Sequence, residues 1–327
     1  MRSWHLWVFA FLLLALTGFG FDILPASSSA KFVPPPGKVL LFIGQDHDTI
    51  ERYVSEVGLV PAGVMLYTSI QKLEGLDEPA DMGGGVQHGG YYLKNHKFTA
   101  LQIGLYMVNA LDGVIDGTHD GNIRRLADWV HAAKRPVYLR IGYEFDLPDN
   151  GYDPQKYQQA YRKIVDIFRE RKVNNAAFVW HTYAGFVEGS RLRWYPGDGY
   201  VDWFAVSFFD PYNQGNYDAF AKLAAQHRKP LMIAEATPRG MDFKQGEKTW
   251  NIWFKRYFEF IRRYDVRAAS YINCNWEELP MFRGQGWGDA RIQKSELIRD
   301  RWRKEIRQDR YLLPTMRLFN ELDKGRM

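Results

Sequence analysis

Residues 137–146 read VYLRIGYEFD, a mostly apolar run that reaches Gly142 and is then followed by two carboxylates, Glu144 and Asp146. The apolar part predicts a buried β-strand. A carboxylate is unfavourable inside a packed core, but it is expected where a strand ends at a functional site. The stretch therefore predicts a core strand whose carboxyl end lies at such a site.

Seven other segments share this near-continuous apolar character, which fits parallel strands covered on both faces. With residues 136–145, the predicted strands are 38–46, 63–69, 99–107, 176–184, 201–210, 230–237 and 267–276. Helical patterns lie between them. The clearest begins at Asp153-Pro154, a cap followed by proline at the first helical position.

Eight strands that alternate with helices predict an α/β fold, a single-domain (β/α)8 TIM barrel. A doubly wound open sheet is the alternative, but no glycine-rich phosphate loop follows a strand. The glycine-rich segment 81–90 is expected to be a long loop over one barrel face.

The first 30 residues are expected to be a secretory signal peptide, with Arg2 before an apolar run from Leu6 to Phe21 and small residues at 28–30. An uncleaved membrane anchor is the alternative. We therefore expect a secreted or periplasmic protein that meets a membrane only if this segment is retained. Residues 31–37, KFVPPPG, are expected to be an extended proline-rich linker, which leaves 38–327 as the barrel domain.

Composition excludes several classes of protein. The net charge of +5 is mild and its basic residues are scattered, so no nucleic-acid partner is expected. Cys274 is the single cysteine, which excludes an intrachain disulfide and a cysteine-based zinc site.

Two carboxylates are expected to face each other at the barrel mouth. Active sites of such barrels lie at the carboxyl ends of the strands, where Glu144 ends the fourth predicted strand and Glu235 the seventh. Opposed carboxylates suit the hydrolysis of a glycosidic bond, since one donates a proton and the other attacks or activates water. A gap of about 5–5.5 Å predicts retention of configuration, and a wider gap inversion. Aromatic rings offer flat faces for sugars, and the candidates are Trp180, Tyr183, Trp276 and Trp287.

The sequence resembles clan A glycoside hydrolases, and within them glycoside hydrolase family 26, which includes β-mannanases, some β-1,3/1,4-glucanases and β-1,3-xylanases. The resemblance covers most of residues 38–310. It rests on VYLRIGYEFD, on PLMIAEATPRG (230–240), on VDWFAVSFFDPY (201–212) and on GWGDARI (286–292). The resemblance implies that Glu144 is the acid/base and Glu235 the nucleophile. It also implies that Arg140 supports the nucleophile and that Trp276 lies beneath the bound sugar.

The chain departs from the mannanase pattern at positions that contact sugar. Tyr143 stands where mannanases usually have histidine before the acid, and residues 144–154 lack the tryptophans often seen there. The family pattern has a tyrosine near the nucleophile. The segment SFFDPY does not show which residue takes this place here, because the candidates are Phe208, Phe209 and Tyr212. These departures leave the catalytic pair in place and weaken the assignment to mannan.

The resulting hypothesis is an exported, retaining, endo-acting glycoside hydrolase that cleaves a β-linked polysaccharide of the β-mannan or β-glucan type without a cofactor or metal. We expect Glu144 to have a raised pKa and Glu235 to stay ionised beside Arg140. Asp146 is expected to fix a loop. The predicted substrate contacts are Arg140, Tyr143, Trp180, His181, Tyr212, Trp276 and Asp46.

Three alternatives stay open. The first is an inactive sugar-binding barrel in a polysaccharide synthesis or export system. The second is a metal-dependent polysaccharide deacetylase that uses Asp46, His47 and Asp48 as ligands. The third is a transglycosylase, which would use the same residues.

Overall fold

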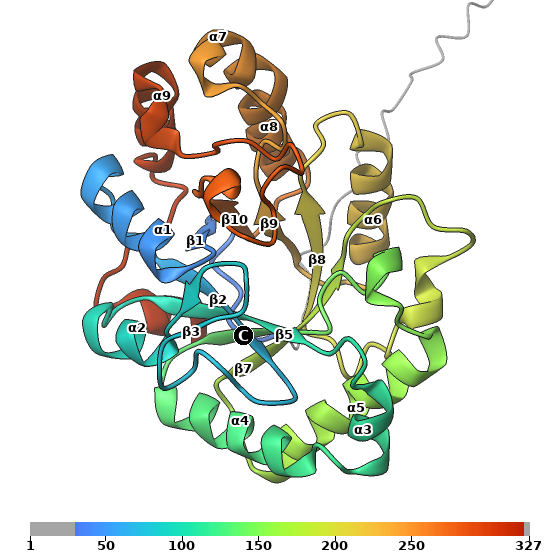
Figure 1. Cartoon of the computed structure of the whole chain (residues 1–327). Helices are drawn as coiled ribbons and strands as arrows, with labels where there is room; N and C mark the ends of the chain where they lie inside the picture. Colours follow the sequence, from blue (N-terminus) through green and yellow to red (C-terminus); the bar gives the residue numbers. More distant parts are fainter. Residues whose placement is uncertain (1–29, 324–327) are drawn as a thin grey trace, which may run out of the picture.

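The computed structural model describes residues 30–323 and has a closed barrel of eight parallel strands at its centre, in the ring order β1, β10, β9, β8, β7, β6, β5, β2 (Figure 1). The predicted (β/α)8 barrel is confirmed, because each predicted strand contains one barrel strand. These are β1 (Leu40–Gly44), β2 (Gly63–Ser69), β5 (Ala100–Tyr106), β6 (Val137–Ile141), β7 (Ala176–Thr182), β8 (Trp203–Phe208), β9 (Leu231–Ala236) and β10 (Ala268–Ile272).

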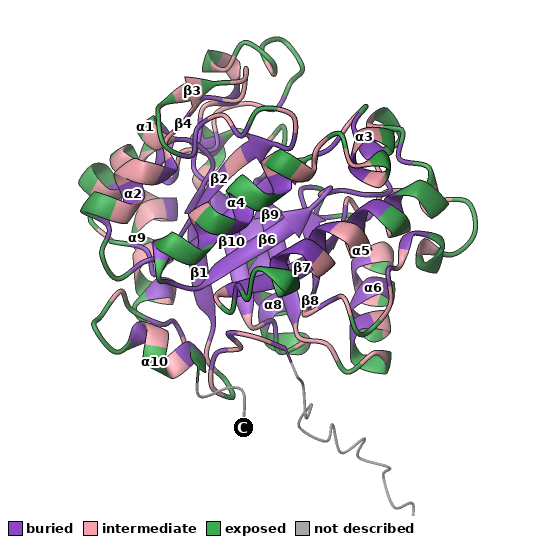
Figure 2. Ribbon diagram, turned by 90° about the horizontal axis from the view of Figure 1, so that it is seen from below, coloured by how far each residue is buried: buried purple, intermediate pink, exposed green. Residues whose placement is uncertain are grey.

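Helices surround the barrel, with buried faces toward the strands and exposed faces outward (Figures 1 and 2). Asp153 caps the longest of them as predicted, since its Oδ1 accepts from the amides of Gln155 and Lys156. The helices are α1 (His47–Arg52), α2 (Gly89–Asn95), α3 (Leu111–Asp116), α4 (Asp120–Ala133), α5 (Pro154–Glu170), α6 (Gln214–Gln226), α7 (Gly246–Thr249), α8 (Lys255–Arg263), α9 (Glu296–Ile306) and α10 (Leu318–Asp323). Within residues 30–323, no helix has both the length and the apolar character needed to cross a membrane.

The barrel interior changes from apolar to polar along the strands. Its lower part is an apolar cluster that includes Tyr138, Val179 and Ala205. Because side chains of a strand alternate between its faces, the next inward positions on β6, β7 and β8 are Arg140, His181 and Ser207, and all three are fully buried. On these three strands the inward side chains thus become polar toward the carboxyl ends.

The proline-rich segment that we expected to be a linker is part of the domain. Phe32 packs into the lower barrel cluster, and its carbonyl accepts a hydrogen bond of 2.5 Å from Tyr138 Oη. The Lys31 carbonyl accepts one of 2.8 Å from Trp203 Nε1. Leu318 and Leu322 of α10 join the same cluster, so the two ends of the described chain close the bottom of the barrel together. The expected signal peptide lies outside the described residues, apart from Ala30.

The glycine-rich segment 81–90 is more ordered than the single loop that we predicted. Strands β3 (Ala80–Asp81) and β4 (Val86–Gln87) pair antiparallel, and Gly89 and Gly90 begin α2. Figure 2 shows this hairpin and α10 at opposite ends of the barrel. The hairpin therefore lies at the end of the barrel where the polar side chains gather.

Candidate active site

Glu144 leaves β6 through a tight, left-handed turn. Gly142 has φ +55° and Glu144 itself φ +52°, a left-handed conformation that is uncommon for a non-glycine residue. The turn is held in place, because the Phe145 amide donates to the His181 carbonyl at 3.1 Å and Asn150 Nδ2 donates to the Glu144 carbonyl at 2.9 Å. The carboxyl group is turned inward, and the residue is 8% exposed.

Glu235 lies on β9 and forms an ion pair with Arg140 of β6, whose Nη1 contacts Glu235 Oε1. The pairing register between β8 and β9, the strand that carries Glu235, shifts between Val206 and Ser207. The Arg140 guanidinium also lies over the rings of Tyr67 and Tyr143, with 4.9 and 5.1 Å to the ring centroids. The pair is almost closed to solvent, since Arg140 has no exposed surface and Glu235 is 6% exposed.

Gly104 of β5 makes room for this guanidinium. A Cβ at this position would lie 2.8 Å from Arg140 Nη2 and 2.6 Å from Tyr67 Cδ1, closer than real contacts allow. The glycine in ALQIGLY is therefore required by the approach of Arg140.

The two carboxyl groups have different surroundings. Burial, and then the charge of Glu235, raise the pKa of Glu144 well above its usual range. A hydrogen bond of 2.6 Å from Ser207 Oγ and the charge of Arg140 oppose that rise only in part. Glu235, by contrast, has a guanidinium in contact with it. Burial thus favours the protonated form of one carboxyl group, while the other contacts a guanidinium, a contrast that suits acid-assisted attack on a glycosidic bond.

Comparison with known proteins agrees with this geometry. A sequence profile of the family described as Glycosyl hydrolase family 26 matches residues 104–271, which include β6, Glu144 and Glu235. A β-1,3-xylanase of Vibrio sp, TXYA, is 31% identical over 324 residues that cover 90% of this chain and 70% of that protein. The chain belongs to glycosyl hydrolase family 26.

Other similar proteins agree with the family and with the barrel fold. A β-1,3-xylanase of Alcaligenes sp is 30% identical over 321 residues, 89% of this chain and 68% of that protein. Among solved structures, a family 26 β-mannanase from Bacteroides ovatus superposes with a TM-score of 0.64 at 13% identity, over 86% of this chain and 93% of that one. A modular endo-β-1,4-mannanase from Cellulomonas fimi gives 0.61 at 17% identity, over 87% and 74%. At this low identity the two structures support the barrel fold alone, whereas the sequence matches identify the chain as a glycoside hydrolase of a family that acts on β-linked polysaccharides.

Two further predicted residues lie beside Glu144 and Glu235 in this family 26 enzyme. His181 Nδ1 is 3.3 Å from Arg140 Nη1, and its Nε2 is 3.0 Å from Ser207 Oγ. Burial, and then the charge of Arg140, lower the pKa of His181 well below its usual range, so the ring is neutral. Tyr143 packs against Tyr67 at 5.3 Å between ring centroids. With no exposed surface, His181 is placed to orient other groups and not to touch substrate.

Trp180 does not face the site, and the sugar contact predicted for it is corrected. It lies one residue before His181 on β7, so its side chain points to the opposite face, toward the surrounding helices. Its ring is fully buried and stacks on Phe145 at 4.4 Å and 5°, with Phe204 at 4.9 Å and Phe220 at 5.5 Å. Trp180 therefore belongs to the packed core.

Trp276 follows β10 at the barrel mouth but is only 2% exposed. Its Nε1 donates to Thr237 Oγ1 at 3.1 Å, and Trp287 and Phe282 cover its ring at 4.7 and 4.5 Å. As the structure stands, it presents no open face to a sugar. The structure places it as the base of an aromatic cluster beside β9 and β10.

Asp46, which we predicted to contact substrate, caps helix α1. Its Oδ1 accepts from the Thr49 amide at 3.1 Å, and burial raises its pKa. Of the other two residues proposed as metal ligands, His47 Nδ1 lies 3.1 Å from Asp48 Oδ1. Across residues 30–323, His, Cys, Asp and Glu side chains form no group of three or more that could hold a metal ion.

Tyr212 is at the surface, 68% exposed, and lines a hollow of about 450 Å³ between the loops that follow β7, β8 and β9. The same hollow is lined by Tyr183, Phe209 and Arg239. Tyr183 is close enough to Glu144 for their charges to interact. The hollow therefore lies near Glu144, and aromatic rings and Arg239 form part of its wall.

Asp146 fixes the loop after β7, as predicted. Its two oxygens accept from Thr182 Oγ1 at 2.6 Å, from the Tyr183 amide at 2.7 Å and from Arg191 Nε at 2.7 Å. Ser207, which binds both Glu144 and His181, was missed, because a serine within an apolar strand carries no chemical pattern in the sequence. Its position two residues beyond inward-facing Ala205 was the signal that could have found it.

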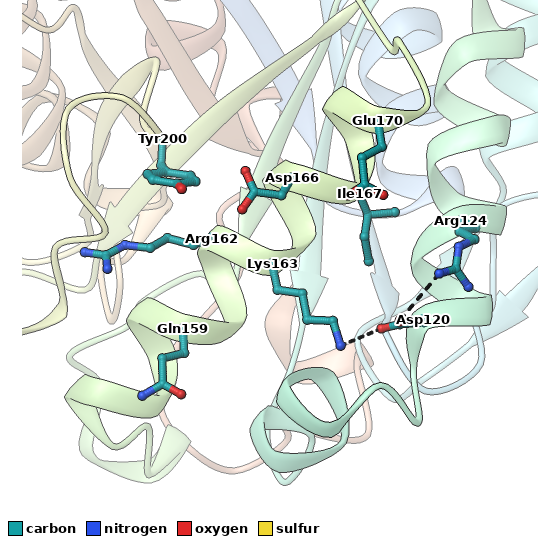
Figure 3. A pocket seen from close by; sticks show the side chains of 9 residues that line it. All are labelled: Asp120, Arg124, Gln159, Arg162, Lys163, Asp166, Ile167, Glu170 and Tyr200. Atoms are coloured by element: carbon teal, nitrogen blue, oxygen red, sulfur yellow. Dashed lines mark ion pairs between the residues drawn. The ribbon is translucent and has the colours of Figure 1, made fainter.

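A second hollow of about 470 Å³ lies outside the barrel, between α4, α5 and Tyr200 (Figure 3). Its charges neutralise each other, since Lys163 pairs with Asp120 at 2.8 Å and Arg124 approaches the same carboxylate at 3.5 Å. This hollow is remote from Glu144 and Glu235, and we assign it no part in the reaction.

Proposed function

We propose that this protein is a retaining, endo-acting hydrolase of a β-linked xylan, with β-1,3-xylan as the first candidate substrate. The observation that carries the mechanism is the contrast between Glu144, whose pKa is raised by burial, and Glu235, which forms an ion pair with Arg140. Glu144 would protonate the leaving oxygen while Glu235 attacks the anomeric carbon. Glu144, then ionised, would activate the water that hydrolyses the glycosyl–enzyme ester.

The choice of sugar rests on the sequence relatives. Two curated relatives of about 30% identity across nine-tenths of the chain are named β-1,3-xylanases. The mannanase structures are only 13–17% identical and support no choice of substrate. Tyr143, where the mannanases usually have histidine, favours a sugar other than mannose. β-Mannan and mixed-linkage β-glucan are the alternative substrates.

The substrate is tested by measuring reducing ends released from β-1,3-xylan, β-1,4-xylan, β-mannan and mixed-linkage glucan. We expect β-1,3-xylan to be cleaved fastest, with internal cuts that shorten the polymer early in the reaction. Proton NMR of the first products should show the β-anomer before mutarotation. An initial α-anomer would contradict retention, and release from mannan alone would contradict the choice of sugar. No release from any polymer would favour the inactive sugar-binding barrel.

Tyr212 is expected to bind the polymer beyond the catalytic pair. Tyr212→Ala should raise KM for the polysaccharide by about 3- to 10-fold, since a stacked aromatic contact is worth about 0.5–1.5 kcal/mol. KM should change far less for a disaccharide aryl glycoside, which is too short to reach this ring. Phe98→Ala is a matched control, because Phe98 is 39% exposed and precedes β5 at the opposite end of the barrel. Equal changes in KM for both variants would contradict the assignment.

We also propose that the protein is exported, because a polymeric substrate lies outside the cell and residues 1–30 resemble a signal peptide. N-terminal sequencing of the protein from the culture medium or periplasm tests this proposal. A mature chain that begins between residues 27 and 31 is expected. Full-length protein confined to the cytoplasm would contradict it.

A further inference from the structure

A chain of buried hydrogen bonds connects the two catalytic carboxyl groups. Arg140 Nη1 contacts Glu235 Oε1 and lies 3.3 Å from His181 Nδ1. His181 Nε2 is 3.0 Å from Ser207 Oγ, which is 2.6 Å from Glu144 Oε1. Arg140, His181 and Ser207 all have no exposed surface, so bulk water does not compete for these bonds.

The chemistry of the first member sets the direction of every bond. A guanidinium only donates hydrogen bonds, so His181 Nδ1 must accept. A neutral imidazole with an accepting Nδ1 carries its hydrogen on Nε2, and this nitrogen therefore donates to Ser207 Oγ. The remaining hydrogen of the Ser207 hydroxyl is then free to point at Glu144 Oε1.

We propose that Arg140, His181 and Ser207 hold Glu144 Oε1 permanently as a hydrogen-bond acceptor, so that Oε2 is the oxygen that carries, donates and recovers the catalytic proton. Ser207 and His181 are thus positioning residues for the acid/base. This inference rests on the proposed role of Glu144 and specifies which of its two oxygens performs it.

The alternative position of the proton is unfavourable. If Oε1 carried it, Oε1 would donate to Ser207 Oγ, which already accepts from His181. The Ser207 hydrogen would then lack an acceptor, since within residues 30–323 Ser207 Oγ has only these two hydrogen-bond partners. A buried hydroxyl hydrogen without an acceptor is costly, so the chain favours the proton on Oε2.

The same arrangement serves both halves of the reaction without rearranging. In the first, the Oε2–H bond breaks, the proton passes to the leaving oxygen, and a Glu235 oxygen bonds to the anomeric carbon as the glycosidic bond breaks. In the second, Oε2 takes a proton from water, the water oxygen bonds to the anomeric carbon, and the ester bond to Glu235 breaks. Oε1 accepts from Ser207 throughout.

Other charged or titratable groups also act on Glu144. Glu235 on β9 and Asp146 in the turn after β6 oppose its ionisation, whereas Arg140 and the Ser207 hydroxyl favour it. Three neighbouring tyrosines also interact with its charge, namely Tyr143, Tyr152 and Tyr183. Ser207→Ala removes only the hydroxyl and leaves these groups in place, so the variant isolates the contribution of the chain.

The proposal is tested by titrating the Glu144 side-chain carbon by ¹³C NMR in glutamate-labelled enzyme, with the resonance assigned by its loss in Glu144→Gln. Ser207 stabilises the ionised form, so Ser207→Ala should raise the pKa of Glu144 by about one to two units. Ser207→Cys, nearly isosteric and a weaker donor, should raise it less. Ser270→Ala is the matched control, since Ser270 is equally buried but bonds Gln102, and should leave the pKa unchanged.

Each other outcome overturns the proposal. An unchanged pKa in Ser207→Ala would make Ser207 a packing residue. A lowered pKa would mean that Glu144 donates to Ser207, the reverse of the proposed direction. If Ser207→Ala does not fold, the sign of the shift in Ser207→Cys decides the question. The titration needs no substrate, so it is independent of activity in Glu144→Gln, which would instead contradict the proposed role of Glu144.

Discussion

Glu235→Ala is expected to lower kcat on the polysaccharide by at least about 10⁴-fold, the scale seen when a catalytic nucleophile is removed. Without this carboxylate no covalent glycosyl–enzyme can form, and Arg140 cannot supply the missing oxygen. The variant should still bind the polymer, because the hollow beside Tyr212 is untouched. Initial rates of reducing-end release and affinity electrophoresis in polysaccharide gels measure the two properties separately.

Stability must be measured with this variant, because it leaves the fully buried Arg140 without its carboxylate partner. Breaking a buried pair in this way costs about 3–5 kcal/mol. Glu235→Gln keeps an oxygen that can accept from Arg140 and should lose activity with a smaller loss of thermal stability. Glu247→Ala, at an exposed site on α7, should retain wild-type activity. Residual activity of Glu235→Gln above a hundredth of wild type would rule out Glu235 as the nucleophile.

Glu144→Ala is expected to lower kcat/KM on the polysaccharide by about 10²- to 10⁴-fold, the usual contribution of general acid–base catalysis. The loss should be much smaller on an aryl glycoside whose leaving group needs no proton, where hydrolysis of the glycosyl–enzyme becomes limiting. Sodium azide should then restore turnover, because azide attacks the anomeric carbon without a general base. The product should be a β-glycosyl azide, identified by NMR.

The pH profile provides an internal check on the same variant. Because burial raises the pKa of Glu144, its acid form persists to higher pH than that of an ordinary carboxyl group, and wild-type kcat/KM should fall as pH rises through that pKa. Glu144→Ala should lack this alkaline decline. A variant that keeps the decline, or that azide does not rescue, would remove Glu144 from the acid/base role.

The barrel could be predicted because its strands are continuous apolar runs, and each run contains one barrel strand. Their ends were less certain: β6 stops at Ile141, four residues before the predicted end, since Gly142 turns the chain out of the sheet. Glu144, Glu235 and Arg140 were predicted from chemistry and family resemblance. The structure brings them together with His181.

Predicted substrate contacts were wrong where the role of a side chain depends on how it is packed. Trp180 and His181 are neighbours in sequence, yet strand alternation sends one into the core and the other toward the catalytic pair. Trp276 and Asp46 do follow strands, as predicted. Trp276, however, is buried by packing, and Asp46 caps a helix. Residues 31–37 were predicted to be a linker because their three prolines favour extension, and the cavity that Phe32 fills exists only after the barrel has closed.

The closure of the barrel floor by residues 31–34 and by α10 fixes how the enzyme can be oriented. Helix α10 lies at the bottom of the barrel (Figure 2), where Phe32 also packs, whereas Glu144 and Glu235 lie at the carboxyl ends of β6 and β9. The chain could be tethered at either end by a lipid-embedded segment, a carrier domain or a solid support. Such a tether would attach the enzyme at the bottom of the barrel and leave the end with Glu144 and Glu235 facing the solution. Enzyme immobilised at either end should accordingly keep Glu144 and Glu235 accessible to long polysaccharide chains.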